Sequence, residues 1–137
     1  MSKSSETNNI LVDTDILIDY SNGKSKILED LFQKHTLGLV SLYISPVTVA
    51  EFLTDNKLKN ESKQKDAEEF LGLFEIIDVG KKEGVMAGKL LRQGHPPFLG
   101  DALIASICLV NNFMLATRNA KHFSKVKGLQ FTPSQSF

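Results

Sequence analysis

Short apolar runs alternate with helix-like patterns along the whole chain, and this alternation limits the possible folds more than any other feature. Runs of about five apolar or β-branched residues, such as residues 113–117, have the length of buried strands. Between the runs, apolar residues recur at helical spacing, for example at Ile27, Leu28, Leu31 and Phe32. Strands that alternate with helices build a parallel sheet covered by helices. The sequence therefore predicts an α/β fold.

The elements expected from these patterns can be placed along the chain. The predicted strands cover residues 9–13, 39–44, 75–79, 113–117 and 129–131. The predicted helices cover residues 14–20, a segment around 27–32, a helix from Pro46, a segment around 67–74, residues 81–93 and a helix from Asp101. Residues 95–100 contain two prolines and are predicted to form a stiff non-helical linker. The helix from Asp101 is apolar nearly all round, so we expect it to be the most buried one.

The composition is that of one globular domain. The chain has 137 residues, of which 42% are hydrophobic and 23% charged, and this suffices for a single ordinary core. Residues 1–8 are polar and are predicted to form a flexible tail ahead of a domain that spans residues 9–137. No apolar run approaches the roughly 20 residues of a membrane helix, and the start lacks the apolar stretch of a signal peptide. We therefore expect a cytoplasmic protein with no membrane partner.

Net charge and cysteine content exclude some classes of function. The formal net charge is zero, which argues against a protein that coats nucleic acid through bulk positive charge. Cys108 is the only cysteine, so no intramolecular disulfide can form. Its apolar neighbours predict a small buried side chain rather than a nucleophile.

Three acidic residues stand where a predicted strand gives way to a helix. Asp13 ends the first strand, Glu51 lies about a turn into the helix from Pro46, and Asp101 opens the most apolar helix. In open α/β sheets, ligands bind in the crevice outside the carboxyl ends of the strands. Three carboxylates gathered there would bind a hard cation, and such sites usually serve phosphoester chemistry.

Each of these acids also has a purely structural interpretation. Asp13 is well placed to cap the helix that starts at Thr14, and Asp101 suits the first turn of its helix. Glu51 has apolar neighbours, which favours a paired or metal-bound carboxylate. It also shares a helix face with Thr48 and Asp55, so a polar stripe is the alternative.

Polar residues follow the predicted strand 113–117 and are candidates for supporting roles. Thr117 and Asn119 offer a hydroxyl and an amide that can position cation-bound water, and Arg118 or Lys121 can pair with a phosphate. Asp15, two residues after Asp13, is predicted to support the site from outside the first set of ligands. A turn with an Asn at its bend is the structural alternative for residues 117–119.

Four segments together resemble those of PIN-domain nucleases, especially the VapC-type toxins of prokaryotic toxin–antitoxin pairs. The order and spacing agree from Ile10 to about Phe131, which is nearly the whole chain. The segments are Val12-Asp13-Thr14-Asp15 with the Ile-Leu-Ile-Asp that follows, Ser45 to Leu53, Gly100-Asp101-Ala102-Leu103-Ile104-Ala105, and Leu115 to Phe123.

The resemblance implies both a fold and an activity. The fold is a single domain with a five-stranded parallel sheet flanked by helices on both faces. The activity is a Mg²⁺- or Mn²⁺-dependent endoribonuclease that hydrolyses RNA phosphodiester bonds, with Asp13, Glu51 and Asp101 as the catalytic, metal-binding acids. Toxins of this type II system are usually homodimers that a small cognate antitoxin holds inactive.

Two positions depart from the family pattern and leave an alternative open. Asn119 stands where the family often has an Asp, and His122 stands at another position that is often Asp. The loss of a carboxylate should weaken the binding of a second metal ion. The alternative function is a catalytically weakened PIN-like module that binds RNA or protein.

Two other enzyme and signalling classes fit less well. Asp13-Thr14-Asp15 looks like the nucleophile motif of haloacid-dehalogenase-type phosphatases, but Leu17 stands where that motif has Thr or Val. The later Gly-Asp element of those phosphatases is also incomplete here, because Ser106 takes the place of its final acid. A phosphoacceptor of the receiver type fits still less well. We therefore favour metal-dependent phosphodiester chemistry.

Overall fold

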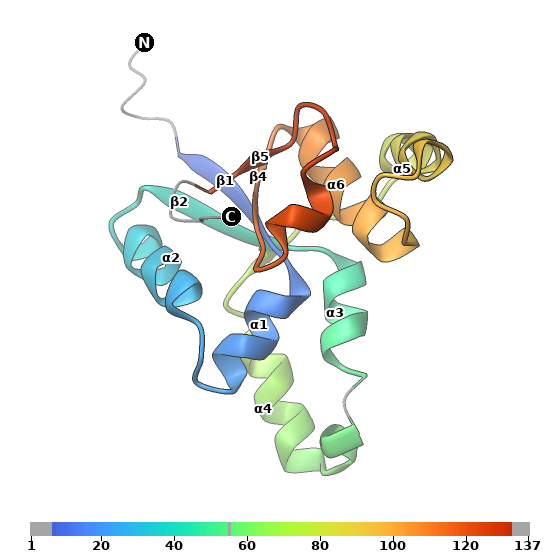
Figure 1. Ribbon diagram of the computed structural model, residues 1–137. Coiled ribbons are helices and arrows are strands. Elements are labelled where there is room, and N and C mark those ends of the chain that lie inside the picture. Colours follow the sequence, from blue (N-terminus) through green and yellow to red (C-terminus); the bar gives the residue numbers. More distant parts are fainter. Residues whose placement is uncertain (1–6, 55, 133–137) are drawn as a thin grey trace.

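A five-stranded parallel sheet forms the centre of the computed structural model, which describes residues 7–54 and 56–132 (Figure 1). The order of the strands is β3-β2-β1-β4-β5, so β1 is central and the chain builds the sheet outwards from it in both directions. The predicted parallel α/β architecture is confirmed. The strands are β1 (Asn8–Val12), β2 (Val40–Ile44), β3 (Glu75–Ile76), β4 (Met114–Ala116) and β5 (Gln130–Phe131).

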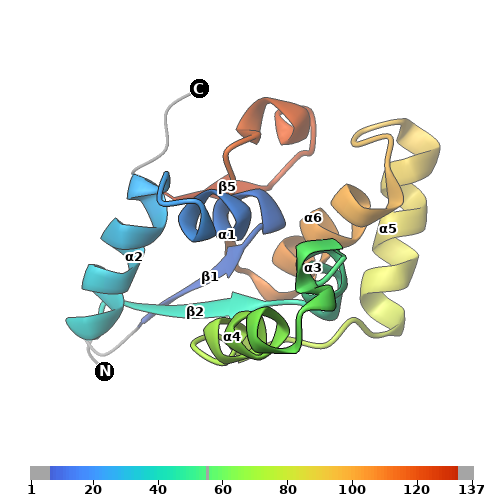
Figure 2. The same ribbon diagram turned by 90° about the horizontal axis from the view of Figure 1, so that it is seen from below.

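Helices connect the strands and cover both faces of the sheet. Figure 2 shows α5 and α6 gathered on one side of the sheet and α1 and α2 on the other. Short 3-10 helices lie at Asn56–Lys59 and Ala120–Phe123. The α-helices are α1 (Thr14–Ser21), α2 (Lys26–Thr36), α3 (Pro46–Phe52), α4 (Glu61–Leu71), α5 (Lys81–Gln93) and α6 (Leu99–Asn111).

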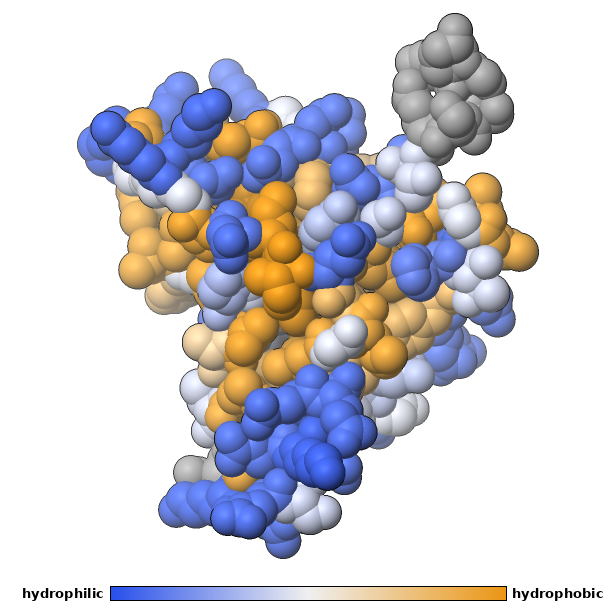
Figure 3. Space-filling model, turned by 180° about the vertical axis from the view of Figure 1, so that it is seen from behind, coloured by the Kyte–Doolittle hydropathy of each residue, from blue (hydrophilic) through white to orange (hydrophobic). Residues whose placement is uncertain are grey.

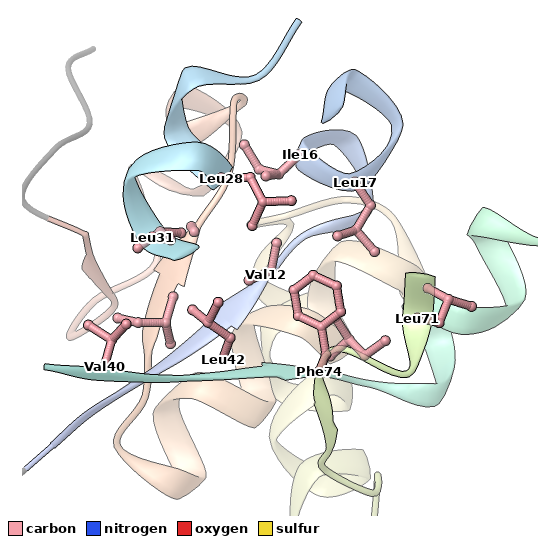
Figure 4. Close-up of a cluster of buried hydrophobic side chains, with 12 residues drawn as sticks. Val12, Ile16, Leu17, Leu28, Leu31, Val40, Leu42, Leu71 and Phe74 are labelled. Atoms are coloured by element: carbon pink, nitrogen blue, oxygen red, sulfur yellow. The ribbon is translucent and has the colours of Figure 1, made fainter. Parts of the chain in front are cut away.

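The central strand alternates its side chains between two hydrophobic cores. Ile10 and Val12 point to the face covered by α1, α2 and α4, where Phe74 and Leu71 complete the cluster (Figure 4). Leu11 points to the opposite face and packs with residues of α5 and α6. A strand buried on both faces reads as a continuous apolar run, which explains the Ile-Leu-Val sequence of β1.

Several element boundaries differ from those predicted. Helix α6 begins at Leu99 rather than at Asp101, because Phe98 has extended backbone and serves as its N-cap, so the predicted linker ends at residue 98. Strand β3 has two residues instead of five. Phe74 lies outside α4, although it is buried against the same core as that helix. The apolar periodicity around Phe74 reflected burial, not a continuous helix.

The helix starts follow the predicted capping chemistry. The Ser45 hydroxyl accepts a hydrogen bond from the Thr48 backbone amide at 3.3 Å, and Pro46 occupies the first turn of α3. Helix α6 is the most buried helix, as its all-round apolar sequence predicted, and Cys108 within it is buried. Helices α1 and α3 follow β1 and β2 directly, so their N-termini lie at the carboxyl ends of the strands.

The outer surface is mixed in polarity. Helix α4, which forms the lower projection in Figure 3, is hydrophilic there, whereas an apolar band crosses the molecule above it. Leu73 and Ile76, which follow α4, are exposed large hydrophobic residues. No helix within the described ranges is long and apolar enough to cross a bilayer.

Helices α5 and α6 are joined by one buried acid. Glu83 accepts a hydrogen bond from the Gly80 backbone amide at 2.9 Å and another from Asn111 Nδ2 at 3.0 Å. The first bond closes the N-terminus of α5, and the second reaches the last turn of α6. The carboxylate therefore fixes one end of this helix pair.

We predict that Glu83→Ala lowers the free energy of unfolding by about 1–3 kcal/mol, because the Gly80 backbone amide and the Asn111 side-chain amide both lose their partly buried, charged acceptor. Urea denaturation followed by circular dichroism measures this change. The matched control is Lys82→Ala at the exposed neighbouring position, for which a change below about 0.5 kcal/mol is expected. Equal effects of the two substitutions would contradict the role given to Glu83.

Candidate functional site

The candidate site lies where β1 and β4 end. The Asp13 backbone amide donates to the Ala116 carbonyl at 2.9 Å, which continues the pairing of these two strands by one residue. Thr117 follows β4 directly and faces Asp13. The sheet reverses its direction of growth between β1 and β4, and crevices at such switch points bind ligands in α/β proteins.

Asp13 is buried and engages both carboxylate oxygens. Oδ1 accepts from the Thr14 backbone amide at 2.8 Å, so Asp13 does cap α1. Oδ2 accepts from the Thr117 hydroxyl at 2.9 Å. The structural interpretation of Asp13 is thus confirmed, and it leaves the second oxygen turned toward the end of β4.

Asp15 faces the same turn from the first turn of α1. Its Oδ2 accepts from Asn119 Nδ2 at 2.9 Å and from the Thr117 hydroxyl at 3.1 Å. The Arg118 backbone amide donates to both Asp15 oxygens, at 3.2 and 3.3 Å. The Thr117 hydroxyl has one proton, so it cannot donate fully to Asp13 and Asp15 at once.

Glu51 is exposed, whereas its apolar neighbours had predicted burial. The apolar residues around it pack on other faces of α3, and the carboxylate projects from the helix. It is nevertheless held, because the Thr14 hydroxyl lies 2.6 Å from Glu51 Oε1. The other carboxylate oxygen lies above Gly100, where an added Cβ would stand 3.2 Å from Oε2. Thr48, on the predicted polar stripe, is buried and lies 3.3 Å from the Thr14 hydroxyl oxygen; Asp55 lies outside the described residues.

Asp101 lies in the first turn of α6 and is half-buried. Burial raises the pKa of this carboxyl above its ordinary value, and the negative charges of Glu51 and Asp15 raise it further. His122 acts in the opposite direction and lowers the pKa. The charges of acids on α1 and α3 therefore act on Asp101.

The two basic residues of the site differ in their surroundings. The Arg118 guanidinium forms an ion pair with Asp19 at 2.8 Å, and Asp19 is half-buried. Lys121 is exposed on the 3-10 helix after β4. Lys121 is thus accessible to an anion. To bind an anionic ligand, the Arg118 guanidinium would first have to release the Asp19 carboxylate.

The donor chemistry of the site fits a hard divalent cation. Its acids supply oxygen ligands only, and Gly100 leaves room that a larger residue would deny to Glu51. In the part of the chain that the structure describes, however, no three His, Cys, Asp or Glu side chains lie close enough together to hold an ion. Glu51 is turned toward Thr14, so binding of an ion by three acids requires side-chain rotation.

Three contributors to this geometry were not identified as such from the sequence. Thr14 holds Glu51, Gly100 makes room for it, and Asp19 pairs with Arg118. Thr14 follows Asp13 and Gly100 precedes Asp101 in the sequence. This adjacency to two predicted site residues could have identified them as part of the site. The Asp19–Arg118 pair joins residues far apart in the chain, and no local pattern indicates it.

Burial, together with neighbouring negative charge, makes the acids of the site costly to ionise. Burial raises the pKa of Asp13 from 3.8 to about 7, and the charge of Asp15 adds to this effect. Hydrogen bonds from Thr117 and Thr14 partly offset the shift, while the charge of Asp101 strengthens it. The pKa of Asp15 is also raised, mainly by burial. An added cation would relieve this repulsion.

The raised pKa of Asp13 predicts a pH-dependent stability. Because the folded protein holds this proton more tightly than the unfolded chain, its stabilising effect is complete below about pH 4 and is lost as the pH rises to about 7. In metal-free buffer with EDTA, Asp13→Asn should therefore lose less stability than the natural protein between pH 5 and pH 8. Asparagine keeps the helix cap. Thermal unfolding curves measure the difference, and parallel pH profiles for the two proteins would contradict it.

Comparison with protein families and curated proteins identifies relatives of this chain. The PIN domain family model matches residues 10–129. The chain is 30% identical over 126 residues to "Ribonuclease VapC1" of Methanocaldococcus jannaschii, with 89% of this chain and 84% of that protein covered. It is 25% identical over 130 residues to "Ribonuclease VapC1" of Rickettsia felis, with coverage of 88% and 92%.

Solved structures share the fold. A chain of a toxin–antitoxin complex from Klebsiella pneumoniae superposes with a TM-score of 0.71 at 25% identity, covering 93% of this chain and 99% of that one. A chain of DNA-bound VapBC from Salmonella typhimurium gives a TM-score of 0.74 at 20% identity, with coverage of 92% and 98%, and at that identity the likeness shows the fold alone. The parallel sheet, the match over residues 10–129 and the identity to curated VapC proteins show that this chain belongs to the PIN-domain family, as a VapC-type member.

Proposed function

We propose that this chain is a Mg²⁺- or Mn²⁺-dependent endoribonuclease that acts as the toxin of a type II toxin–antitoxin pair. The proposal is supported by the placement of three acids near the carboxyl ends of β1 and β4: Asp13 follows β1, the Glu51 carboxylate accepts from the Thr14 hydroxyl and lies 3.2 Å from where a Cβ on Gly100 would stand, and Asp101 follows Gly100 in the first turn of α6. Burial, and to a smaller extent neighbouring negative charge, raises the pKa of Asp13 and of Asp101, so positive charge at this place would stabilise their ionised forms. Relatives named as VapC ribonucleases support RNA as the substrate.

In this proposal, Asp13 and Asp101 would hold the cation directly, and Glu51 would complete the set if its side chain turned away from the Thr14 hydroxyl. A bound divalent cation lowers the pKa of water and offsets charge on the scissile phosphate. The Thr117 hydroxyl, already hydrogen-bonded to Asp13, fixes the orientation of that carboxylate. Water is the attacking group in this proposal, since the Thr14 and Thr117 hydroxyls are engaged with Glu51 and Asp13, and attack by water on the phosphorus with departure of the 3′-oxygen would leave a 5′-phosphate and a 3′-hydroxyl.

Basic residues beside the acids account for RNA binding. Lys121 is exposed and free to approach a phosphate that flanks the cleaved bond. Arg118 contributes when its guanidinium exchanges Asp19 for a phosphate, and that exchange lets Asp19 modulate affinity. These contacts address the backbone of RNA and carry no sequence information.

A groove beside the site supports the proposal of an antitoxin partner. It lies between α1, α3 and α4, has a volume of about 630 Å³, and its lining combines apolar residues such as Tyr20, Phe52 and Phe70 with polar and charged ones. Glu51 is one of the lining residues, so a partner chain seated in the groove would contact this acid. We also propose a homodimer, by analogy with the family, and a cytoplasmic setting, where RNA and antitoxin are both available.

A PIN-like module that binds RNA or protein without cutting is the second candidate. Asn119 favours it, because an amide stands at a position that is often acidic in the family. The Asn119 side-chain amide donates a hydrogen bond to the Asp15 carboxylate, so a carboxylate is still present next to Asn119. That contact supports the nuclease over the binding module.

Metal-dependent cleavage is the direct test. The antitoxin-free protein, incubated with labelled RNA, should cut with Mn²⁺ or Mg²⁺ and not with EDTA. Asp13→Ala and Asp101→Asn should each reduce the rate by more than about a hundredfold and leave the circular dichroism spectrum unchanged. Asp78→Asn, at an exposed acid outside the site, is the control and should cut normally. If both site variants cut RNA as fast as the natural protein, the assignment of the site is wrong. If the folded natural protein binds RNA but does not cut it, the binding module is the better assignment.

The room above Gly100 gives a second test. Gly100→Ala should push the Glu51 carboxylate away, since a Cβ there stands 3.2 Å from Oε2, and lower the cleavage rate about tenfold. The melting temperature should not fall, because alanine is the better helix former. Gly84→Ala is the matched control in α5, where an added Cβ meets nothing within 4 Å. If Gly100→Ala cuts as fast as Gly84→Ala, the positioning of Glu51 by this contact is wrong.

A further inference from the structure

The segment that leads into α6 exposes three apolar residues in a row. Pro97, Phe98 and Leu99 all face solvent, and Phe98 and Leu99 are 69% and 61% exposed. Single exposed apolar residues are common on soluble proteins, whereas a run of three is avoided unless it serves a function. Phe98 is also the N-cap of α6, where Ser, Asp or Asn would stabilise the helix, and its side chain makes no capping hydrogen bond. Neither the helix nor the core therefore explains an aromatic ring at this position.

Phe98 stands beside the acids of the candidate site. Its carbonyl accepts from the Ala102 backbone amide at 2.9 Å, which fixes the backbone of Phe98 against the first turn of α6. Asp101 is the third residue after this N-cap, and side chains at these two positions of a helix are neighbours. A substrate that reaches Asp101 can therefore contact the exposed ring of Phe98.

Basic residues approach Asp101 from another part of the chain. The charge of His122 acts on Asp101, so the 3-10 helix Ala120–Phe123 lies within electrostatic reach of the start of α6. Figure 2 shows this 3-10 helix, in orange-red, at the same end of the molecule as the connection between α5 and α6, with α4 at the opposite end. Residues 102–132 include no acidic residue, and their basic side chains are all exposed: Arg118, Lys121, Lys125 and Lys127. This segment therefore favours a polyanionic ligand.

We propose that Phe98 binds a base of the RNA by stacking, next to the phosphate that the acids address. The inference rests on the proposed function, because the RNA has to occupy the same site. Stacking on an aromatic side chain accepts any base, since every base has a π-face. The base has to be unstacked from its own neighbours, so the segment that binds here is single-stranded RNA.

A nucleic-acid strand fits this surface better than a protein partner does. It combines aromatic bases with a negatively charged backbone, and the surface combines an exposed ring with exposed cations. The exposed apolar run is only three residues long and is bounded by the exposed His95 and the half-buried Asp101. A run of this size is small beside the roughly 800 Å² that each partner contributes to a stable protein interface.

A fluorescent base tests the stacking directly. A short single-stranded RNA with spaced 2-aminopurine bases is added in Mg²⁺ to the full-length, antitoxin-free protein, with Asp101→Asn in every sample to prevent cutting. 2-Aminopurine loses fluorescence when it stacks on an aromatic ring, and fluorescence anisotropy gives the affinity. We expect Phe98→Ala and Phe98→Leu to abolish the quenching and to weaken binding about tenfold. Phe98→Trp should keep the quenching and bind within about threefold.

Charge and exposure are controlled separately. Phe98→Leu removes no charge, so it should leave the salt dependence of binding unchanged, whereas Lys121→Gln should reduce the slope of log affinity against log salt by about one. Leu37→Ala changes a residue that is 72% exposed on a different segment, and it should bind within about threefold. The same RNA annealed to its complement hides its base faces and should bind equally well with and without Phe98→Ala.

A capping variant separates a role in binding from a role in folding. Phe98→Ser should weaken RNA binding as much as Phe98→Ala, while the melting temperature stays the same or rises because serine caps the helix. If Phe98→Ser lowers the melting temperature and leaves RNA affinity unchanged, the ring serves the fold and the proposal is wrong.

The other outcomes distinguish this inference from the proposed function. If Phe98→Leu binds and quenches as Phe98 does, or if Phe98→Ala weakens duplex and single strand equally, stacking is overturned and the nuclease assignment stands. If Phe98→Ala changes the oligomeric state in size-exclusion chromatography but not the RNA affinity, the ring belongs to an interface between copies of the chain. If protein that retains Phe98 binds neither form of RNA, the RNA substrate of the proposed function fails together with this inference.

Discussion

The parallel pairing of β1 with β4 is the constraint on which the site depends. It runs from Ile10 opposite Met114 to Val12 opposite Ala116, and the Asp13 amide extends it by one bond. Because both strands run in the same direction, the residues that follow them arrive at the same edge of the sheet. Asp13 and Thr117, separated by 104 positions in the chain, therefore meet at 2.9 Å. The buried Ile-Leu-Val run of β1 stabilises this register, since a shift by one residue would turn each side chain into the wrong core.

Much of the architecture follows from local sequence. The alternation of apolar runs and helical patterns is enough to predict the sheet, and Ser45-Pro46 is enough to predict the start of α3. The boundaries that were wrong share a physical cause. Phe74 is buried although it lies outside α4, and β3 is a two-residue strand whose residues are exposed, so at this edge of the molecule apolar character does not report regular backbone hydrogen bonding. The start of α6 depends on the extended backbone of Phe98. Phe98 makes no side-chain cap, so the usual capping pattern does not predict this start.

The site was predictable in outline but not in its contacts. Strand ends locate Asp13, and the four family-like segments locate Glu51 and Asp101, because these positions are fixed by the topology. The hydrogen bond of Glu51 to Thr14 and that of Asp15 to Asn119 join different elements, and they depend on side-chain directions that no periodicity encodes. The exposure of Glu51 has the same origin: apolar neighbours along a helix say little about the face on which a given residue stands.

Hydroxyl and amide donors hold the acids of the site in place. The Thr117 hydroxyl lies between Asp13 and Asp15, and the Thr14 hydroxyl holds Glu51, whose other carboxylate oxygen lies beside Gly100. The most direct test is anomalous diffraction from crystals of this protein soaked in Mn²⁺. The account predicts a single strong peak within about 2.5 Å of carboxylate oxygens of Asp13 and Asp101. A peak bound elsewhere, or no peak in crystals whose acids are accessible to solvent, would contradict it.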